Sequence, residues 1–421
     1  MRTPVILVAG QRGTDPVVGA LLRTPGTLVV EHRFDGHVVR RTTAVLTDGV
    51  LTSTECGLEL AHGCVSCTIR NDLLVLLRQL HRRDDVDRIV VHLAPWLEPE
   101  PICLAINHVR VRVAPGGVDG PAALDVSIAA VVTCVDSSTW LSQALGEDEL
   151  DDGRTHAQVV IGQAEFADVV VLDHPNPFLA AVLRRLAPRA RVRVGADGID
   201  DALNNLYRDA RRGRVDDPHG PLLAGQPPLD ARGPIRLVEF NSRRPFHPGR
   251  LHACLDLLLD GVIRTRGRLW LASRADRAMW LESAGAGLRV SSAGKWLAAM
   301  TGPSATASMP SAVCWPRWAG TTGTAIGTPR WQSWCAARIP PRFSTRCRRR
   351  CSPTRSWSAP ASGRGTTTRS AIGMRSRAWA LKPPTTRRSG RGRTRTRHEP
   401  RRRRWDGAVP PTRRSPIAAK P

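Results

Sequence analysis

Residues 4–17, PVILVAGQRGTDPV, indicate the architecture of the chain. Six apolar residues precede Gly10 and Gly13, and Asp15 and Pro16 are typical of helix starts, so the stretch predicts a buried strand, a turn and a helix. Apolar runs recur at 27–31, 88–94, 126–135, 167–172 and 191–194, with helical spacing between them. Continuous apolar strands are typical of a parallel sheet that is buried on both faces. The sequence therefore predicts an α/β fold with ligand sites at the carboxyl ends of its strands.

Composition divides the chain into four segments. Residues 1–215 carry the alternation of strands and helices, and the proline- and glycine-rich residues 216–234 are expected to form a linker. Strand and helix patterns resume over 235–300 and predict a small α+β domain. Residues 301–421 contain a single leucine, Leu381, and no apolar periodicity, so this tail is expected to be disordered.

The net charge of +25 lies entirely in this tail, which holds 27 of the 62 lysines and arginines and two of the 37 acidic residues. Its arginine runs and scattered tryptophans could bind RNA through phosphate contacts and base stacking. A shifted reading frame in a GC-rich gene is the alternative that we favour. Reading one nucleotide out of frame turns acid-rich sequence into arginine, threonine, proline and tryptophan, and it would leave the domain over 235–300 truncated.

The compartment is predicted from apolar runs and cysteines. No run of about 20 apolar residues is present, so no membrane span is expected, and the first apolar run is too short for a signal peptide. A cytoplasmic location is predicted. Six cysteines in residues 1–300 do not form a disulfide framework, and the CxxC pair of Cys64 and Cys67 indicates metal or redox chemistry.

The turn after the first predicted strand lies where a nucleotide-binding α/β domain has its phosphate loop. Gly10 and Gly13 remain as candidate cofactor-binding residues, but residues 15–17, DPV, replace the expected Gly-Lys-Thr. An acidic residue at a helix N-terminus competes with phosphate for the positive end of the helix dipole. Taken alone, this segment is better explained as an ordinary strand, turn and helix.

Residues 63–70, GCVSCTIR, resemble the G-C-x-C-C-T-[IV]-R segment of the CobW family, P-loop GTPases associated with metal delivery and zinc homeostasis. Further similar segments follow in the family's order at 131–136, 163–172, 246–250 and 263–272. The resemblance covers about residues 4–300. It implies a P-loop NTPase-like domain, a CobW C-terminal domain, and Asp136 as a residue of the nucleotide site.

Three nucleotide elements depart from the family pattern. Beside the altered phosphate loop, residues 92–99, HLAPWLEP, replace E-x-x-G-x-x-x-P and lose an acid near the metal and a glycine near the γ-phosphate. Residues 173–176, DHPN, replace the guanine-reading N-K-x-D. We therefore expect little or no GTP hydrolysis, which makes GTP with Mg²⁺ a poor candidate cofactor.

Cys64 and Cys67 are the candidate metal ligands, and zinc is the candidate ion. Ser66 stands where the family has a middle cysteine, so binding is expected to be weaker than in a three-cysteine relative. Further ligands could come from the adjacent His62 or from more distant side chains, conceivably His32, Asp35, His92 and Glu98. The alternative is a pair of reduced cysteines that packs beside a helix start.

Four segments, 30–41, 61–67, 92–103 and 267–273, resemble an actinobacterial branch of the CobW family. Members of this branch recruit a hibernation factor to the ribosome under zinc limitation. The resemblance implies that the ribosome and such a factor are partners and that the chain is an adapter. The alternative is a GTPase metallochaperone that delivers Zn²⁺ or Co²⁺.

Overall fold

The computed structural model describes residues 1–60, 63–112, 118–215, 235–241, 245–296 and 330–335. The chain divides into two compact units, Met1–Ser358 and Ala359–Pro421, and the second lies wholly outside the described residues. The expected linker over 216–234 is also outside them.

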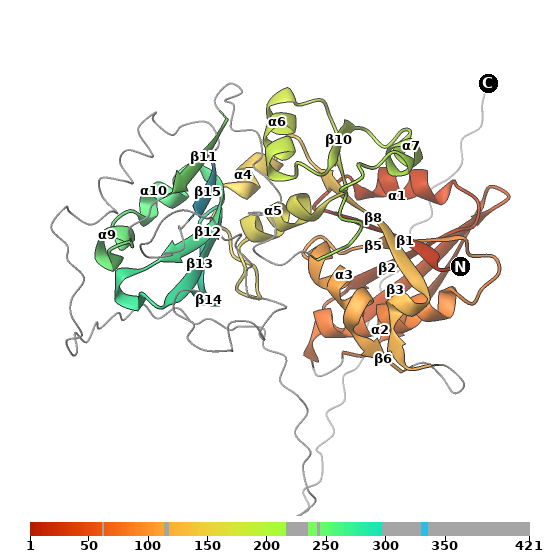
Figure 1. Cartoon of the computed structure of the whole chain (residues 1–421). Helices are drawn as coiled ribbons and strands as arrows, with labels where there is room; N and C mark the ends of the chain where they lie inside the picture. Colours follow the sequence, from red (N-terminus) through yellow and green to blue (C-terminus); the bar gives the residue numbers. More distant parts are fainter. Residues whose placement is uncertain (61–62, 113–117, 216–234, 242–244, 297–329, 336–421) are drawn as a thin grey trace, which may run out of the picture. The chain divides into compact units, whose positions relative to one another are not determined.

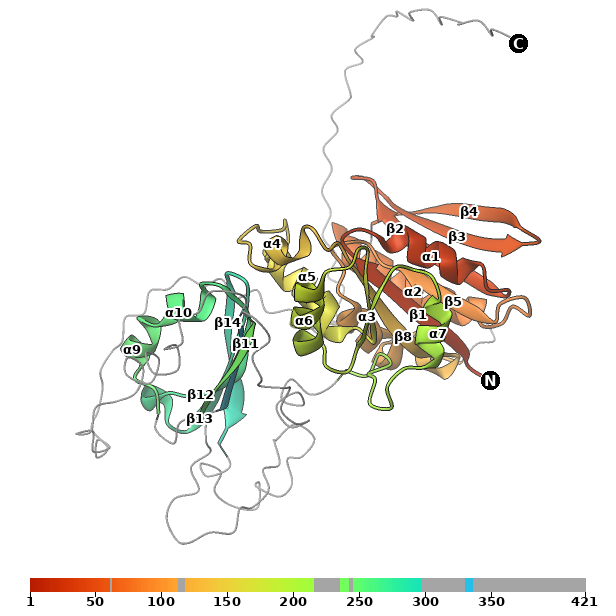
Figure 2. The ribbon, with the colours of Figure 1, turned by 90° about the horizontal axis from the view of Figure 1, so that it is seen from above.

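The N-terminal part of the chain (Figure 1) contains an eight-stranded sheet. The order of its strands is β10-β9-β8-β1-β5-β2-β3-β4. Its strands are β1 Thr3–Gly10, β2 Thr27–Phe34, β3 Val39–Thr47, β4 Val50–Leu58, β5 Arg88–His92, β8 Val126–Val135, β9 Val169–Leu172 and β10 Arg191–Val194. From β10 to β2 every neighbouring pair is parallel, and β3 and β4 add an antiparallel hairpin at the outer edge (Figure 2). The predicted α/β fold with a mostly parallel sheet is confirmed.

Helices cover both faces of this sheet. They are α1 Thr14–Leu22, α2 Val65–Leu80, α3 Pro99–His108, α4 Trp140–Ala144, α5 His156–Phe166, α6 Pro177–Leu186 and α7 Ile199–Asn204. Alternate residues of β1 separate the two cores: Val5 and Leu7 share one with α2 and α3, whereas Ile6 and Val8 share the other with α1. The central strand is buried on both faces, as its unbroken apolar run predicts.

Three helices differ from the sequence-based expectation, and the helix expected over 248–260 is divided into α9 Pro248–His252 and α10 Leu255–Leu259. The apolar spacing predicts a helix over 72–83, but α2 begins seven residues earlier, so that Cys67 lies in its first turn. The spacing of apolar residues also predicts a helix over 201–212, and the structure has the shorter α7, which ends at Asn204. The earlier start of α2 matters most, because it places the CxxC pair on a helix N-terminus.

A second, antiparallel sheet contains β11 Arg236–Asn241, β12 Val262–Trp270, β13 Arg277–Ala284, β14 Gly287–Lys295 and β15 Arg330–Cys335. The short helices α9 Pro248–His252 and α10 Leu255–Leu259 accompany it, with a core that includes Phe246 and Leu269. This is the expected α+β domain. Strand β15 comes from the tail, so the expected disorder is wrong for residues 330–335: their backbone pairs with both β11 and β12. The rest of the tail lies outside the described residues, so its disorder, its RNA binding and its shifted reading frame stay predictions.

The remaining described elements are short. Strand β6 Arg110–Val111 pairs with β7 Gly120–Pro121, and there are two separate 3₁₀ turns, η2 Ala122–Leu124 and η3 Ala272–Arg274. Over the described ranges, no helix is both long enough and apolar enough to span a bilayer.

Candidate nucleotide and metal site

The loop after β1 keeps its two glycines for reasons of backbone geometry. Gly10 has a φ of 147°, and a Cβ built on it would lie 2.5 Å from the carbonyl oxygen of Cys134 on β8. Gly13, with a φ of 73°, is the N-cap of α1 and has open space around it. Glycine is favoured at both positions by the turn itself, so its presence does not require a bound phosphate.

The side chain of Gln11 ties this loop to two other elements. Its Nε2 donates to the carbonyl oxygen of Pro95 at 2.6 Å and to Oε1 of Gln163 at 3.2 Å. Its Oε1 lies 2.9 Å from Nε2 of His156, the first residue of α5. Gln163 in turn donates to Pro95 and Leu97 at 2.8 Å. The loop after β1 is thus held by the chain's own polar groups.

His92 joins three elements at the carboxyl end of the sheet. It ends β5, in the position of the expected acid, and its Nε2 lies 2.9 Å from Oγ1 of Thr14 at the start of α1. Its Nδ1 lies 3.1 Å from Oε1 of Glu31 on β2, which also accepts from Nε of Arg33 at 2.8 Å. Burial acts to raise the pKa of Glu31, but the hydrogen bonds with His92 and Arg33 outweigh it and lower this pKa.

Asp136 ends up in a turn after β8. Its Oδ1 accepts from the hydroxyl of Ser138 at 2.5 Å and from the N–H groups of Ser138 and Thr139 at 2.8 and 3.2 Å. The hydrogen bond from the Ser138 hydroxyl is the main cause of the lowered pKa of Asp136. This carboxylate has the contacts of a structural Asx turn.

Asp173 and Asn176, which follow β9, are used in a similar way. Asp173 accepts from the N–H groups of Ser137 and His174, both at 2.8 Å. Asn176 caps α6 by accepting from the N–H of Leu179 at 3.0 Å, and it donates to the carbonyl oxygen of Ser137 at 3.2 Å. These side chains lock the loops after β8 and β9 together.

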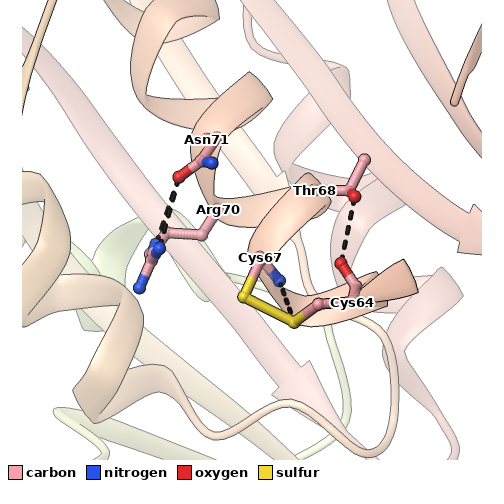
Figure 3. Close-up of a disulfide and its surroundings, with 5 residues drawn as sticks. All are labelled: Cys64, Cys67, Thr68, Arg70 and Asn71. Carbon is pink, nitrogen blue, oxygen red and sulfur yellow. Dashed lines mark hydrogen bonds between the residues drawn. A yellow bond between two sulfur atoms is a disulfide. The ribbon is translucent and has the colours of Figure 1, made fainter. Parts of the chain in front are cut away.

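Cys64 and Cys67 lie side by side at the start of α2. They form a disulfide with their Cα atoms 5.2 Å apart, and both residues are half-buried (Figure 3). Cys64 is the helix N-cap, and the N–H of Cys67 donates to its Sγ at 3.2 Å. The carbonyl oxygen of Cys64 accepts from Thr68. The structure brings the two candidate ligands together.

Other side chains do not complete a metal site around this pair. Of the four conceivable distant ligands, His32 is buried with its Nε2 2.8 Å from Oδ2 of Asp72, and His92 is engaged as above. Asp35 forms an ion pair with Arg40, and Glu98 forms one with Arg154. Within the ranges that the structure describes, no three His, Cys, Asp or Glu residues are grouped to hold a metal ion, and His62 falls outside those ranges.

Sequence reasoning missed the contacts of Glu31, Gln11 and His156. Glu31 ends an apolar run, where α/β folds gather polar side chains, so that position was a usable signal. His156 and Gln11 are 145 residues apart, and no pattern links them. The sequence also did not indicate that Cys64 would cap a helix.

Two family profiles match the chain: the CobW/HypB/UreG nucleotide-binding domain over residues 30–181 and the cobalamin synthesis protein cobW C-terminal domain over residues 235–317. The chain is 72% identical over 300 residues to the zinc chaperone Rv0106 of Mycobacterium tuberculosis (strain ATCC 25618 / H37Rv), which covers 71% of this chain and 75% of that protein.

More distant similarities extend the comparison. The chain is 24% identical over 267 residues to the zinc-regulated GTPase metalloprotein activator 1 of Dictyostelium discoideum, covering 58% of this chain and 55% of that protein. The crystal structure of the Zn(II)-bound YjiA GTPase from E. coli aligns with a TM-score of 0.35 at 14% identity, over 82% of this chain and 98% of that chain.

Proposed function

Because the chain belongs to the CobW family, we propose that it is a metallochaperone that carries Zn²⁺ on Cys64 and Cys67 in their reduced form. The juxtaposition of these two sulfurs at the half-buried start of α2 carries the proposal. The zinc chaperone Rv0106, which is 72% identical over 300 residues, supports zinc as the ion. Zinc is here a cargo that is bound and passed on.

An incomplete set of ligands suits this role. Zn²⁺ prefers four ligands in a tetrahedron, and a structural site fills all four positions. Cys64 and Cys67 supply two, and the described part of the chain groups no third His, Cys, Asp or Glu with them. The open positions can accept ligands from a receiving protein, so that zinc is transferred by ligand exchange without first being released.

We propose that nucleotide turnover contributes little to this function. The loop after β1 lacks the lysine that would bind the β- and γ-phosphates, and it has Asp15 in the first turn of α1. The side chain of Gln11 is engaged with Pro95 and Gln163, and Thr14 is engaged with His92. These contacts support a loop that is stable without nucleotide.

Zinc competition tests the proposed cargo site. The reduced full chain is titrated with Zn²⁺ against a chromophoric chelator, under argon, and one Zn²⁺ per chain is expected. The double variant Cys64→Ser, Cys67→Ser should lose this zinc, whereas Cys56→Ser, which removes a free cysteine on β4, should keep it. Stoichiometric zinc in the double variant would contradict the proposal.

GTP hydrolysis tests the nucleotide part separately. Phosphate release by the full chain with GTP and Mg²⁺ is expected to stay at the rate of buffer alone, with or without Zn²⁺. Robust, Mg²⁺-dependent turnover would instead favour a GTPase metallochaperone that couples hydrolysis to delivery of Zn²⁺ or Co²⁺.

A second proposal concerns partners: the chain recruits a hibernation factor to the ribosome during zinc limitation. The internal use of the nucleotide-site side chains supports it, because an adapter needs no turnover. Cosedimentation of the full chain with purified ribosomes at low and high salt tests it. Binding that survives high salt is expected, whereas binding that salt abolishes would report only the charge of the basic tail.

A further inference from the structure

The CxxC pair differs in its chemical state from four other cysteines of the chain. Cys64 and Cys67 form a disulfide, whereas Cys56, Cys103, Cys134 and Cys254 are free. Three of those free thiols are buried, and burial raises the pKa of Cys103 and Cys134, the latter to about 12. Only the half-buried pair at the start of α2 combines a sulfur–sulfur bond with partial exposure to solvent among the residues described.

The surroundings of this pair favour opening of the bond. Cys64 caps a helix of 16 residues, and its Sγ already accepts the N–H of Cys67 at 3.2 Å (Figure 3). The first turn of α2 contains no acidic residue, and Arg70 follows in the next turn. The positive end of the helix dipole and this N–H stabilise negative charge on the Cys64 sulfur as it leaves. Cys64 is therefore the better leaving group of the two.

We propose that Cys64 and Cys67 are a thiol–disulfide exchange site for dithiols and small thiols, and that the disulfide and the zinc complex are alternative states of it. The second half of this proposal rests on the proposed function. A dithiol reductant attacks the sulfur of Cys67, the sulfur–sulfur bond breaks, and its electron pair stays on Cys64. The second thiol of the reductant then attacks the mixed disulfide and releases Cys67. Two electrons and two protons pass from the reductant, which leaves as a disulfide.

Zinc enters the same scheme because a cysteine binds Zn²⁺ as a thiolate and not when its sulfur is held in a disulfide. In the reverse direction, a small disulfide oxidises the zinc complex: the two cysteines form their bond, two small thiolates leave, and Zn²⁺ is released. The described part of the chain groups no third ligand that could retain the ion. One oxidation event therefore empties the site, and one reduction event restores it.

The test equilibrates the full chain in mixtures of reduced and oxidised glutathione. Acid quenching, alkylation and mass spectrometry then report the state of the peptide that contains Cys64 and Cys67, and bound zinc is measured in parallel. We expect a single two-electron transition, in which a change of about 30 mV in buffer potential changes the ratio of disulfide to dithiol about tenfold. Bound zinc should fall with the same midpoint.

Control variants separate the two proposals. Cys56→Ser should behave as the wild type, and Cys67→Ser should form a mixed disulfide with glutathione at Cys64. If the pair stays reduced in excess oxidised glutathione, the proposed exchange site is wrong. If zinc is retained after oxidation, the proposed coupling to zinc is wrong. If the disulfide titrates but the reduced pair binds no zinc, the proposed function fails and the exchange site stands.

Discussion

Two loops at the carboxyl edge of one sheet differ in how their polar groups are paired. In the loop after β1, polar side chains are paired inside the protein: Gln11 with Pro95 and Gln163, and Thr14 with His92. At the start of α2, Cys64 and Cys67 are joined by a disulfide, and the Sγ of Cys64 accepts a hydrogen bond from the backbone N–H of Cys67. The first loop resembles a finished structural element, and the second a site with ligand positions still open.

The difference separates side chains that are paired within the protein from a cysteine pair whose sulfurs have few other partners. Asp136 accepts hydrogen bonds within a turn after β8, and Asn176 caps α6, so both side chains contribute to the local fold. The cysteine pair contributes no comparable packing, because both residues are only half-buried.

Gly10→Ala should have the largest effect on stability. Its φ of 147° is strained for any other residue, and the new Cβ would meet the carbonyl oxygen of Cys134. We expect the free energy of unfolding in urea to fall by about 2–4 kcal/mol, and that of Gly13→Ala, which has open space, by about 1 kcal/mol. Equal and small losses would instead suggest that Gly10 is retained for a ligand.

Ser66→Cys should strengthen zinc binding at the start of α2. It restores a third thiolate beside Cys64 and Cys67 in the first turn of α2, so the zinc dissociation constant of the reduced chain should fall about tenfold or more, which corresponds to 1.4 kcal/mol. Chelator competition measures it, with Ser66→Ala as the matched control. An unchanged affinity would place the bound zinc elsewhere.

The main sheet could be predicted because its parallel strands are continuous apolar runs. β1, β5, β8 and β9 are almost entirely buried, and their sequences show it directly. β3 and β4 were missed for the opposite reason: nearly every residue of β4 is exposed, so its threonines and serine show no alternation with a core. Exposed hairpins carry little hydrophobic signal.

The site could be predicted only where it is local. Cys64 and Cys67 are three residues apart, so the motif itself indicated their proximity. The Glu31, His92 and Thr14 network joins three segments that meet only when the sheet has formed. Register between β2 and β5 places Glu31 opposite His92, and no sequence pattern specifies that register.

His92→Leu should remove contacts of the loop after β1 and lower the free energy of unfolding by a moderate amount. It removes both hydrogen bonds of the ring and one partner of Glu31, so we expect a loss of about 1–2 kcal/mol in the free energy of unfolding at pH 7. The pKa of Glu31 is lowered in the folded state, so its contribution is present above the unfolded pKa and is lost as pH falls through the folded pKa.

Urea unfolding of wild type and His92→Leu between pH 7 and pH 3 measures this dependence. The difference between the two proteins should narrow toward acid pH, because Glu31 becomes protonated in both. Arg33→Gln is the matched control, since its side chain is 69% exposed and its loss should have a smaller effect. A difference that widens toward acid pH would contradict the role assigned to Glu31.

Substitution of Asp136 should have the smallest effect on stability, and it distinguishes a structural role in the turn from a role in ligand binding. Asp136→Ala removes the acceptor for Ser138 and Thr139 and should cost about 1 kcal/mol of stability, whereas Asp136→Asn keeps an acceptor oxygen and should cost less. Because the pKa of Asp136 is lowered, its contribution disappears as pH falls through that value, and Asp136→Asn should lack this acid dependence. If Asp136 instead bound a nucleotide, both variants would weaken GTP binding while the free energy of unfolding stayed unchanged. That result would assign a ligand-binding role to a carboxylate that we interpret as part of a turn.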